Sequence, residues 1–176
     1  MNRTPAPTPA PAQAPTPRAA ELAARLIHNF NHAPLTHEAR PPLYDTQCAR
    51  LAVGTAASKL GASIDTLAPG MRGCPYHRHH AQEELFIVLE GSGTLRVAGE
   101  LLPVKAGDVV FIPAGCDYPH QIINSSPLPM KFLSVSTRQR PELCEYPDSG
   151  KLVAWSGETR LTHRTAANLD YWDGEP

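Results

Sequence analysis

Six short apolar segments follow one another between residues 60 and 136, and this succession most limits the folds open to the chain. They are rich in Val, Ile, Leu and Phe, and Gly, Pro, Asn or Ser separates them. No helix-length periodic segment interrupts the region, which disfavours a parallel βαβ fold and favours an antiparallel jelly roll or similar barrel. The predicted strands cover residues 60–68, 84–90, 93–99, 107–115, 120–124 and 130–136.

Two of these predicted strands, residues 84–90 and 108–112, are apolar on both faces. Such a pattern is typical of strands that are buried on both sides. We expect one face to line the barrel and the other to meet a second sheet or a partner subunit.

The length of 176 residues suits a single domain with flanking segments. The Pro- and Ala-rich residues 1–18 are predicted to be a disordered tail. Residues 19–45 are predicted to form a helix and an arm, because residues 19–30 carry apolar side chains at helical spacing and would pack on the domain. The barrel itself is predicted to cover residues 46–140.

The remaining segment, residues 141–176, is predicted to be an irregular C-terminal extension that packs on the barrel. Within it, residues 151–155 have the composition of an edge strand. The apolar side chains of Leu169, Tyr171 and Trp172 are expected to hold the extension against the body.

Charge and composition exclude several partners. The formal net charge is −1 and no basic run occurs, which argues against nucleic acid as a partner. No stretch approaches the roughly 20 apolar residues that span a bilayer. Residues 1–18 also lack the apolar centre of a secretory signal, so we expect a cytoplasmic protein. In that reducing compartment, free thiols are expected at Cys48, Cys74, Cys116 and Cys144.

A group of metal-ligating residues lies around the second predicted strand. His77 and His79 are two residues apart, so in an extended chain both imidazoles project to one face. Glu84 opens the next strand, and an antiparallel return would bring its carboxylate beside the two rings. His120 begins a later strand and could supply a third imidazole from across the barrel.

These two segments resemble the two sequence motifs of the cupin superfamily. The resemblance covers roughly residues 60–136 and is closest to small single-domain cupins without an established reaction. The chain departs from the motifs in two places: Met71 replaces the leading glycine, and two extra residues separate Gly115 from His120. The matching positions are His77, His79, Glu84 and Gly91 in the first motif, and Gly107, Pro113, Gly115, His120 and Asn124 in the second.

The resemblance implies an all-β double-stranded β-helix, the cupin or jelly-roll barrel, that assembles as a homodimer. It also implies one divalent transition metal, which could be Fe, Mn, Zn, Ni or Cu. Glu84 is preferred to Glu83 as a ligand because only Glu84 stands six residues before Gly91, and His80 is expected to be exposed or to support a ligand. The implied ligands are His77, His79, Glu84 and His120.

Three kinds of function are compatible with such a centre. The first is an enzyme that acts on a small oxygen-rich molecule, with a dioxygenase ranked slightly above a sugar-type isomerase. A sugar-phosphate isomerase would need inward-facing cations, and Arg78 is predicted to point away from the ligands. The second is a module that binds or senses a small ligand, and the third is a structural homodimer stabilised by its metal.

Overall fold

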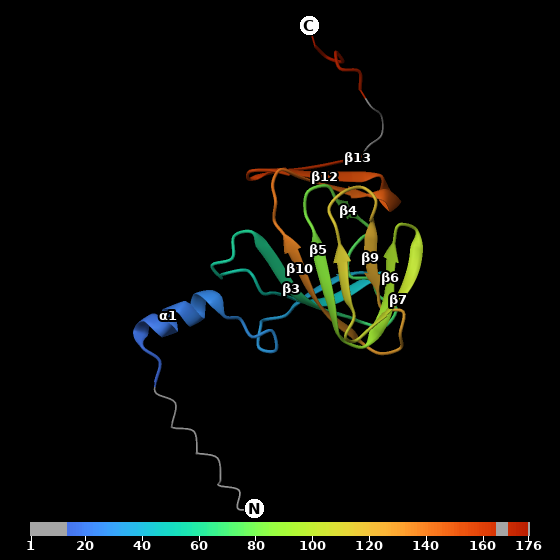
Figure 1. Ribbon diagram of the computed structural model, residues 1–176. Helices are drawn as coiled ribbons and strands as arrows, with labels where there is room; N and C mark the ends of the chain where they lie inside the picture. Colours follow the sequence, from blue (N-terminus) through green and yellow to red (C-terminus); the bar gives the residue numbers. More distant parts are fainter. Residues whose placement is uncertain (1–13, 165–168, 176) are drawn as a thin grey trace, which may run out of the picture.

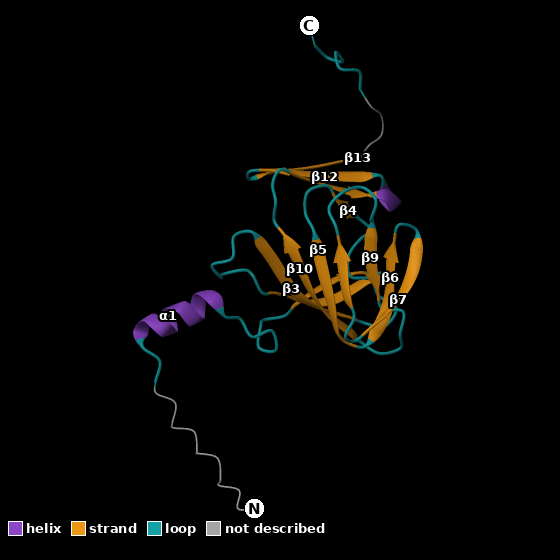
Figure 2. Ribbon diagram, viewed as in Figure 1, coloured by secondary structure: helices purple, strands orange, loops and turns teal. Residues whose placement is uncertain are grey.

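The structure is a computed structural model that describes residues 14–164 and 169–175 (Figures 1 and 2). Most of the predicted disordered tail, residues 1–13, lies outside the described residues. In the described part, all pairs of neighbouring strands are antiparallel. The strands of the barrel are β1 (Thr36–Arg40), β2 (Tyr44–Arg50), β3 (Leu60–Leu67), β5 (Glu84–Glu90), β6 (Ser92–Val97), β7 (Glu100–Lys105), β8 (Val109–Ile112), β9 (His120–Ile123) and β10 (Met130–Thr137).

Two sheets form the wall of the barrel. The larger has the strand order β1-β2-β3-β10-β5-β8, and the smaller has the order β7-β6-β9. Their facing sides enclose the apolar core, and the expected antiparallel all-β barrel is confirmed. The core consists of Leu67, Phe86, Val88, Leu95, Val104, Ile112, Ile122, Met130 and Phe132.

Alternation along β5 places side chains as expected on the inner face. Phe86 and Val88 are buried in the core, while Leu85 and Ile87 on the other face are half-buried. The outer face of the neighbouring strand β8 is open in the single chain, because Val109 and Phe111 are 47% and 72% exposed. Burial of this face would therefore need a partner, which remains a prediction.

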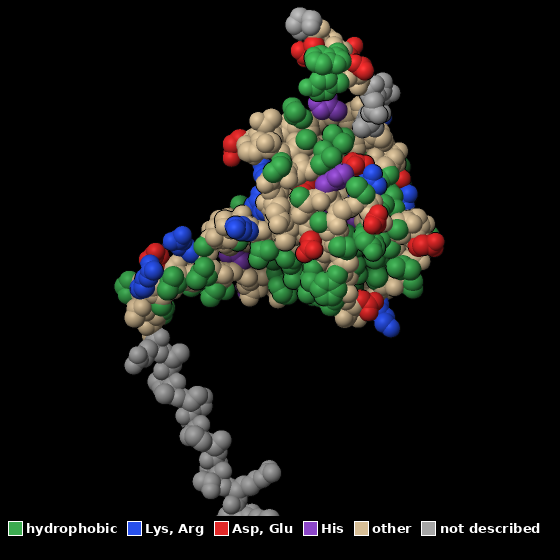
Figure 3. Space-filling view, turned by 45° about the horizontal axis from the view of Figure 1, so that its top comes forward, with side chains coloured by type: hydrophobic (Ala, Val, Ile, Leu, Met, Phe, Trp, Pro, Cys, Tyr) green, Lys and Arg blue, Asp and Glu red, His purple; other side chains and the backbone are tan. Residues whose placement is uncertain are grey.

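The N-terminal helix differs from the expectation. Helix α1 (Pro17–Leu26) begins after Thr16, whose hydroxyl accepts a hydrogen bond from Ala19 N–H at 3.2 Å. It has no buried residue and extends away from the barrel (Figure 1), so the predicted packing on the domain is wrong. Apolar side chains are exposed along it (Figure 3), including Leu26 at 61%. Helical periodicity predicts which side chains share a face but not whether another element covers that face.

The C-terminal segment is also more regular than predicted. Strands β11 (Glu142–Tyr146), β12 (Lys151–Ser156) and β13 (Thr159–Arg164) form a third sheet with the two-residue strand β4 (Arg78–His79), and the short 3₁₀ turn η1 (Pro147–Ser149) joins β11 to β12. Figure 1 shows this sheet lying across one end of the barrel. The predicted strand at residues 151–155 exists as β12, but it is a central strand, paired with β11 and β13.

The last apolar side chains do not hold the C-terminus against the body. Leu169, Tyr171 and Trp172 are 74%, 85% and 69% exposed, and the two aromatic rings contact each other. The predicted anchoring is therefore wrong. None of the helices in the described ranges combines the length and apolar character needed to cross a membrane.

Candidate metal centre

Three histidines and one glutamate meet at the end of the barrel below the third sheet. His77 and His120 face each other across an antiparallel bridge, with each backbone N–H donating to the other residue's carbonyl at 3.1 and 2.7 Å. His79 follows in β4, and Glu84 opens β5. Two extra residues before His120 therefore do not keep it from the cluster, because backbone pairing fixes its position.

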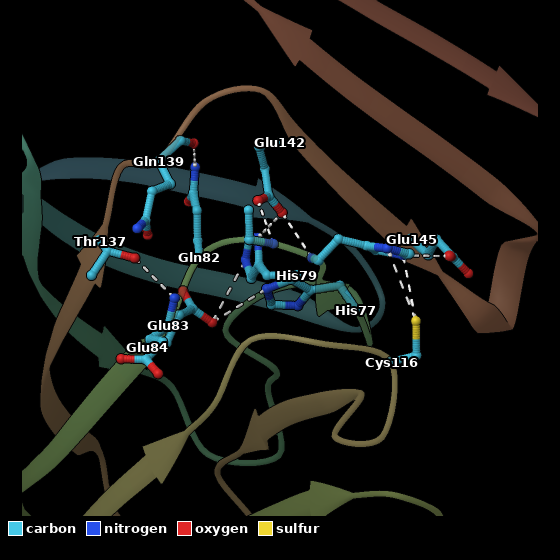
Figure 4. A network of polar contacts seen from close by, with 12 residues as sticks. His77, His79, Gln82, Glu83, Glu84, Cys116, Thr137, Gln139, Glu142 and Glu145 are labelled. Carbon is cyan, nitrogen blue, oxygen red and sulfur yellow. Dashed lines mark hydrogen bonds and ion pairs between the residues drawn. The ribbon is translucent and has the colours of Figure 1, made fainter.

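The Nε2 atoms of all three rings point toward one carboxylate oxygen. Oε2 of Glu84 lies 2.6 Å from Nε2 of His120, 3.6 Å from that of His77 and 3.7 Å from that of His79. His77 and His120 are buried, at 8% and 1% exposure. The structure thus brings together the four residues named from the sequence, whereas Glu83 is exposed. Figure 4 labels three of the four, His77, His79 and Glu84.

The opposite ring nitrogens show which atoms are free to bind a cation. Nδ1 of His77 lies 2.9 Å from the carbonyl oxygen of Pro75, and Nδ1 of His120 lies 3.0 Å from that of Tyr118. Because a carbonyl only accepts, each Nδ1 carries the proton and a neutral ring presents a lone pair at Nε2. The Nε2 lone pairs and the negatively charged carboxylate of Glu84 repel each other unless a proton or a cation lies between them. The donor set fits a divalent transition metal.

Electrostatics in the cluster agree with a site that attracts positive charge. Burial alone would raise the pKa of Glu84, but hydrogen bonds from His120 and His77 outweigh it and hold this pKa well below its usual range. Burial alone would lower the pKa of His77, yet Cys74 and Glu84 raise it well above the ordinary value. For His79, burial dominates and lowers the pKa.

A fifth residue, Glu142, was not identified from the sequence. Its carboxylate is 3% exposed and accepts a hydrogen bond from Nδ1 of His79 at 3.0 Å. It also accepts the backbone N–H groups of His80 and Ala81 at 3.2 and 2.9 Å. Glu142 therefore fixes the ring of His79 and the turn after it. It stands 61 to 63 residues from the three residues that it contacts, so only the pairing of β11 with β4 reveals it.

A cavity of about 210 Å³ adjoins the cluster inside the barrel. Its size is below the 300–1,000 Å³ typical of pockets for larger ligands, so the enclosed part of a ligand must be small. One side is apolar and the other polar. The lining residues are Ser63, Asp65, Gly73, Cys74, His77, Glu84, Phe86, His120, Ile122, Phe132 and Ser134.

Asp65 gives this cavity an acid outside the histidine cluster. Burial raises the pKa of Asp65, and hydrogen bonds from Ser63 and Cys48 offset that rise in part. The Ser63 hydroxyl donates to its Oδ2 atom at 2.6 Å. Burial and then the nearby Asp65 raise the pKa of Cys48 to about 12, so this thiol stays protonated. The pKa of Asp65 therefore lies above that of an ordinary aspartate, which is a feature of candidate proton-transfer groups beside a cavity.

Cations lie next to the cavity on its polar side. A second hollow of about 240 Å³ shares Ser63 and Ser134 with it and is also lined by Arg50 and Arg138. Arg78 points away from the cluster as predicted, because its guanidinium contacts Glu145. The two hollows share Ser63 and Ser134, and the second contains two arginines, of which Arg50 is paired with Glu38 at 3.0 Å.

Comparison with known proteins identifies the barrel. The family model described as Cupin domain matches residues 63–136. An uncharacterised protein of Methanocaldococcus jannaschii is 38% identical over 60 residues, which are 34% of this chain and 46% of that protein. The chain spans about half the length of the curated relatives that it matches first.

Two crystal structures share most of the fold. A candidate sugar phosphate isomerase from Acidithiobacillus ferrooxidans has a TM-score of 0.72 and 22% identity, over 80% of this chain and 90% of that one. A sugar phosphate isomerase of the cupin superfamily from Silicibacter pomeroyi has a TM-score of 0.69 and 25% identity, over 81% of this chain and 96% of that one.

Proposed function

The chain contains a cupin domain, and on that premise we propose that it is a metal-dependent isomerase of a small, oxygen-rich substrate that carries an anionic group. The observation that supports this proposal is that the half-buried acid Asp65 lines the same cavity as His77, Glu84 and His120. The proposed ligands of one divalent transition metal are His77, His79, Glu84 and His120.

The proposed reaction moves a proton between two neighbouring carbons. The carboxylate of Asp65 takes a proton from the carbon beside a carbonyl group, and the electron pair of the broken C–H bond moves toward the carbonyl oxygen. The resulting Asp65 carboxylic acid then returns the proton to the former carbonyl carbon, and the hydroxyl proton of the first carbon passes to the former carbonyl oxygen, so an α-hydroxy carbonyl substrate is isomerised without net oxidation. A bound metal would polarise the carbonyl as a Lewis acid.

The surroundings of the cavity support a substrate with an anionic end. The enclosed volume of about 210 Å³ fits the reacting carbons, and the adjoining hollow with Arg50 and Arg138 fits a phosphate or carboxylate. The similarity to the Silicibacter pomeroyi sugar phosphate isomerase agrees with this proposal. These features reverse the ranking from the sequence, in which an oxygenase came first.

Solvent exchange during turnover tests the proposal. Chain loaded with Mn²⁺, Fe²⁺ or Zn²⁺ and incubated without oxygen in D₂O with three- to six-carbon sugar phosphates is expected to place deuterium beside the carbonyl carbon, as seen by NMR. Chain treated with a chelator serves as the control. Oxygen consumption without exchange would favour the dioxygenase, and absence of both reactions would contradict an enzyme for these substrates.

The Glu142→Gln variant tests the support of the metal centre. The amide keeps the shape of the carboxylate but places an NH₂ group against one of three donors, so the ring of His79 loses its fixed orientation. We expect metal affinity to fall by about 10- to 100-fold, measured by competition with a coloured chelator. Glu90→Gln, a change at an exposed glutamate, is the control, and equal affinities of the two variants would contradict this role.

A further inference from the structure

A second group of metal-ligating side chains lies on the other side of β4. The Sγ atom of Cys116 lies 3.8 Å from Nε2 of His80, and this nitrogen lies 2.6 Å from Oε1 of Glu145. One ligand atom from each of the three residues falls within 4.8 Å of the others. We propose that these three residues form a separate zinc site, independent of the proposed isomerase centre.

The backbone holds the three residues in place before any ion binds. The pairing of β11 with β4 sets Glu145 opposite Arg78, directly beside His80. The loop that carries Cys116 is tied to β4, because Gly115 N–H donates to the carbonyl of His79 at 2.8 Å. A site assembled from three segments that are already hydrogen-bonded to one another needs little ordering on binding.

Arg78 also holds Cys116 and Glu145 in position, although it is not one of the three proposed zinc ligands. Its guanidinium contacts Oε2 of Glu145 at 2.5 Å and the carbonyl of Cys116 at 3.0 Å. The other carboxylate oxygen, Oε1, faces His80. Arg78 can therefore orient Glu145 as a ligand through Oε2 while Oε1 binds the ion, as residues around metal ligands commonly do.

The distances suit a tetrahedral zinc ion with a small adjustment. Bond lengths of about 2.3 Å to sulfur and about 2.0 Å to nitrogen or oxygen place tetrahedral ligands roughly 3.3–3.6 Å apart. The Sγ–Nε2 distance of 3.8 Å is close to this, and the Nε2–Oε1 distance of 2.6 Å must widen. Thiolate, imidazole and carboxylate are all zinc ligands, and thiolate plus carboxylate balance a charge of two. Cys116 is exposed, so water can take the fourth position.

The site is distinct from the candidate metal centre although it borders it. His79 and His80 are neighbours in the chain but project to opposite sides, one ring toward Glu84 and the other toward Glu145. Figure 4 shows Cys116 and Glu145 together at one side of the network, away from Glu84. Loss of either site should therefore leave the ligands of the other in place.

Titration with Co²⁺, a spectroscopic substitute for Zn²⁺, tests the proposal. The unmodified chain is expected to develop a thiolate-to-cobalt charge-transfer band in the near ultraviolet. Cys116→Ser should abolish that band and lower the number of Zn²⁺ ions bound, measured by calorimetry, by one per chain. Because Cys116 is exposed, this change leaves the core intact.

Two control variants separate the sites. Cys74→Ser removes a thiol beside His77 and should keep the band, and His120→Ala dismantles the first centre and should also keep it. Absence of the band in the unmodified chain, or its survival in Cys116→Ser, would overturn the zinc site. If instead the proposed function fails because the first centre binds no metal, the charge-transfer band still forms. His120→Ala then leaves the number of Zn²⁺ ions bound per chain unchanged.

Discussion

The Asp65→Asn variant is expected to isomerise its substrate about 10²- to 10⁴-fold more slowly than the unmodified chain, with the metal content unchanged. The amide has the shape of the carboxylate but cannot accept the proton from carbon. Asp65 contacts Ser63 and lies outside the proposed ligand set, so its replacement leaves the metal centre intact. The rate of deuterium incorporation in D₂O and the metal content of the same sample give the two readouts.

The pH dependence distinguishes a catalytic acid from a structural one. The deprotonated form of Asp65 starts the reaction, so the rate should rise as pH increases through its raised pKa. This rising limb should be absent in Asp65→Asn. Asp45→Asn removes an equal charge at an exposed position paired with His37 and should leave rate and profile unchanged. A slow Asp65→Asn variant that has also lost its metal would contradict a catalytic role.

Local patterns in the sequence were sufficient for six strands of the barrel, but they did not reveal β1, β2 and β7. The period-two spacing of His77 and His79, and of Phe86 and Val88, depends only on the extended backbone, so it carries directly into the structure. The six predicted strands between residues 60 and 136 all appear, with ends that differ by up to three residues.

Features that depend on distant partners were not predictable in the same way. Strand β11 carries two glutamates in five residues, and its apolar pattern is too short to identify it as a strand. Its pairing with β4 nevertheless places Glu142 against His79 and Glu145 against His80. Asp65 was overlooked for a related reason, since one acid in a predicted strand acquires meaning only when the cavity beside it is known.

Metal removal is expected to have the other large effect. At a free metal concentration about 1,000 times the dissociation constant, binding to the folded chain alone adds roughly 4 kcal/mol to the free energy of unfolding. Thermal unfolding with and without chelator should therefore show a clear fall in melting temperature. His120→Ala removes one buried ligand, and a loss of about 100-fold in affinity would leave only about 1.4 kcal/mol of this stabilisation at the same metal concentration.

The stabilisation by the metal should grow with pH, because protons compete with the metal for the ligating histidines. His77 must be neutral to bind the metal, and its pKa in the metal-free chain is raised, so affinity falls as pH drops through that raised pKa. In the metal-free chain the pKa of His77 is raised, so its charged form stabilises folding at low pH, and that contribution is lost as pH rises through the raised pKa. The contribution of Glu84, whose pKa is depressed, is present above about pH 4.3 and constant across this range. The difference in melting temperature between loaded and metal-free chain should thus be larger at pH 8 than at pH 6. If the difference in melting temperature does not change with pH, or is equally large in His120→Ala, the metal does not bind to these histidines.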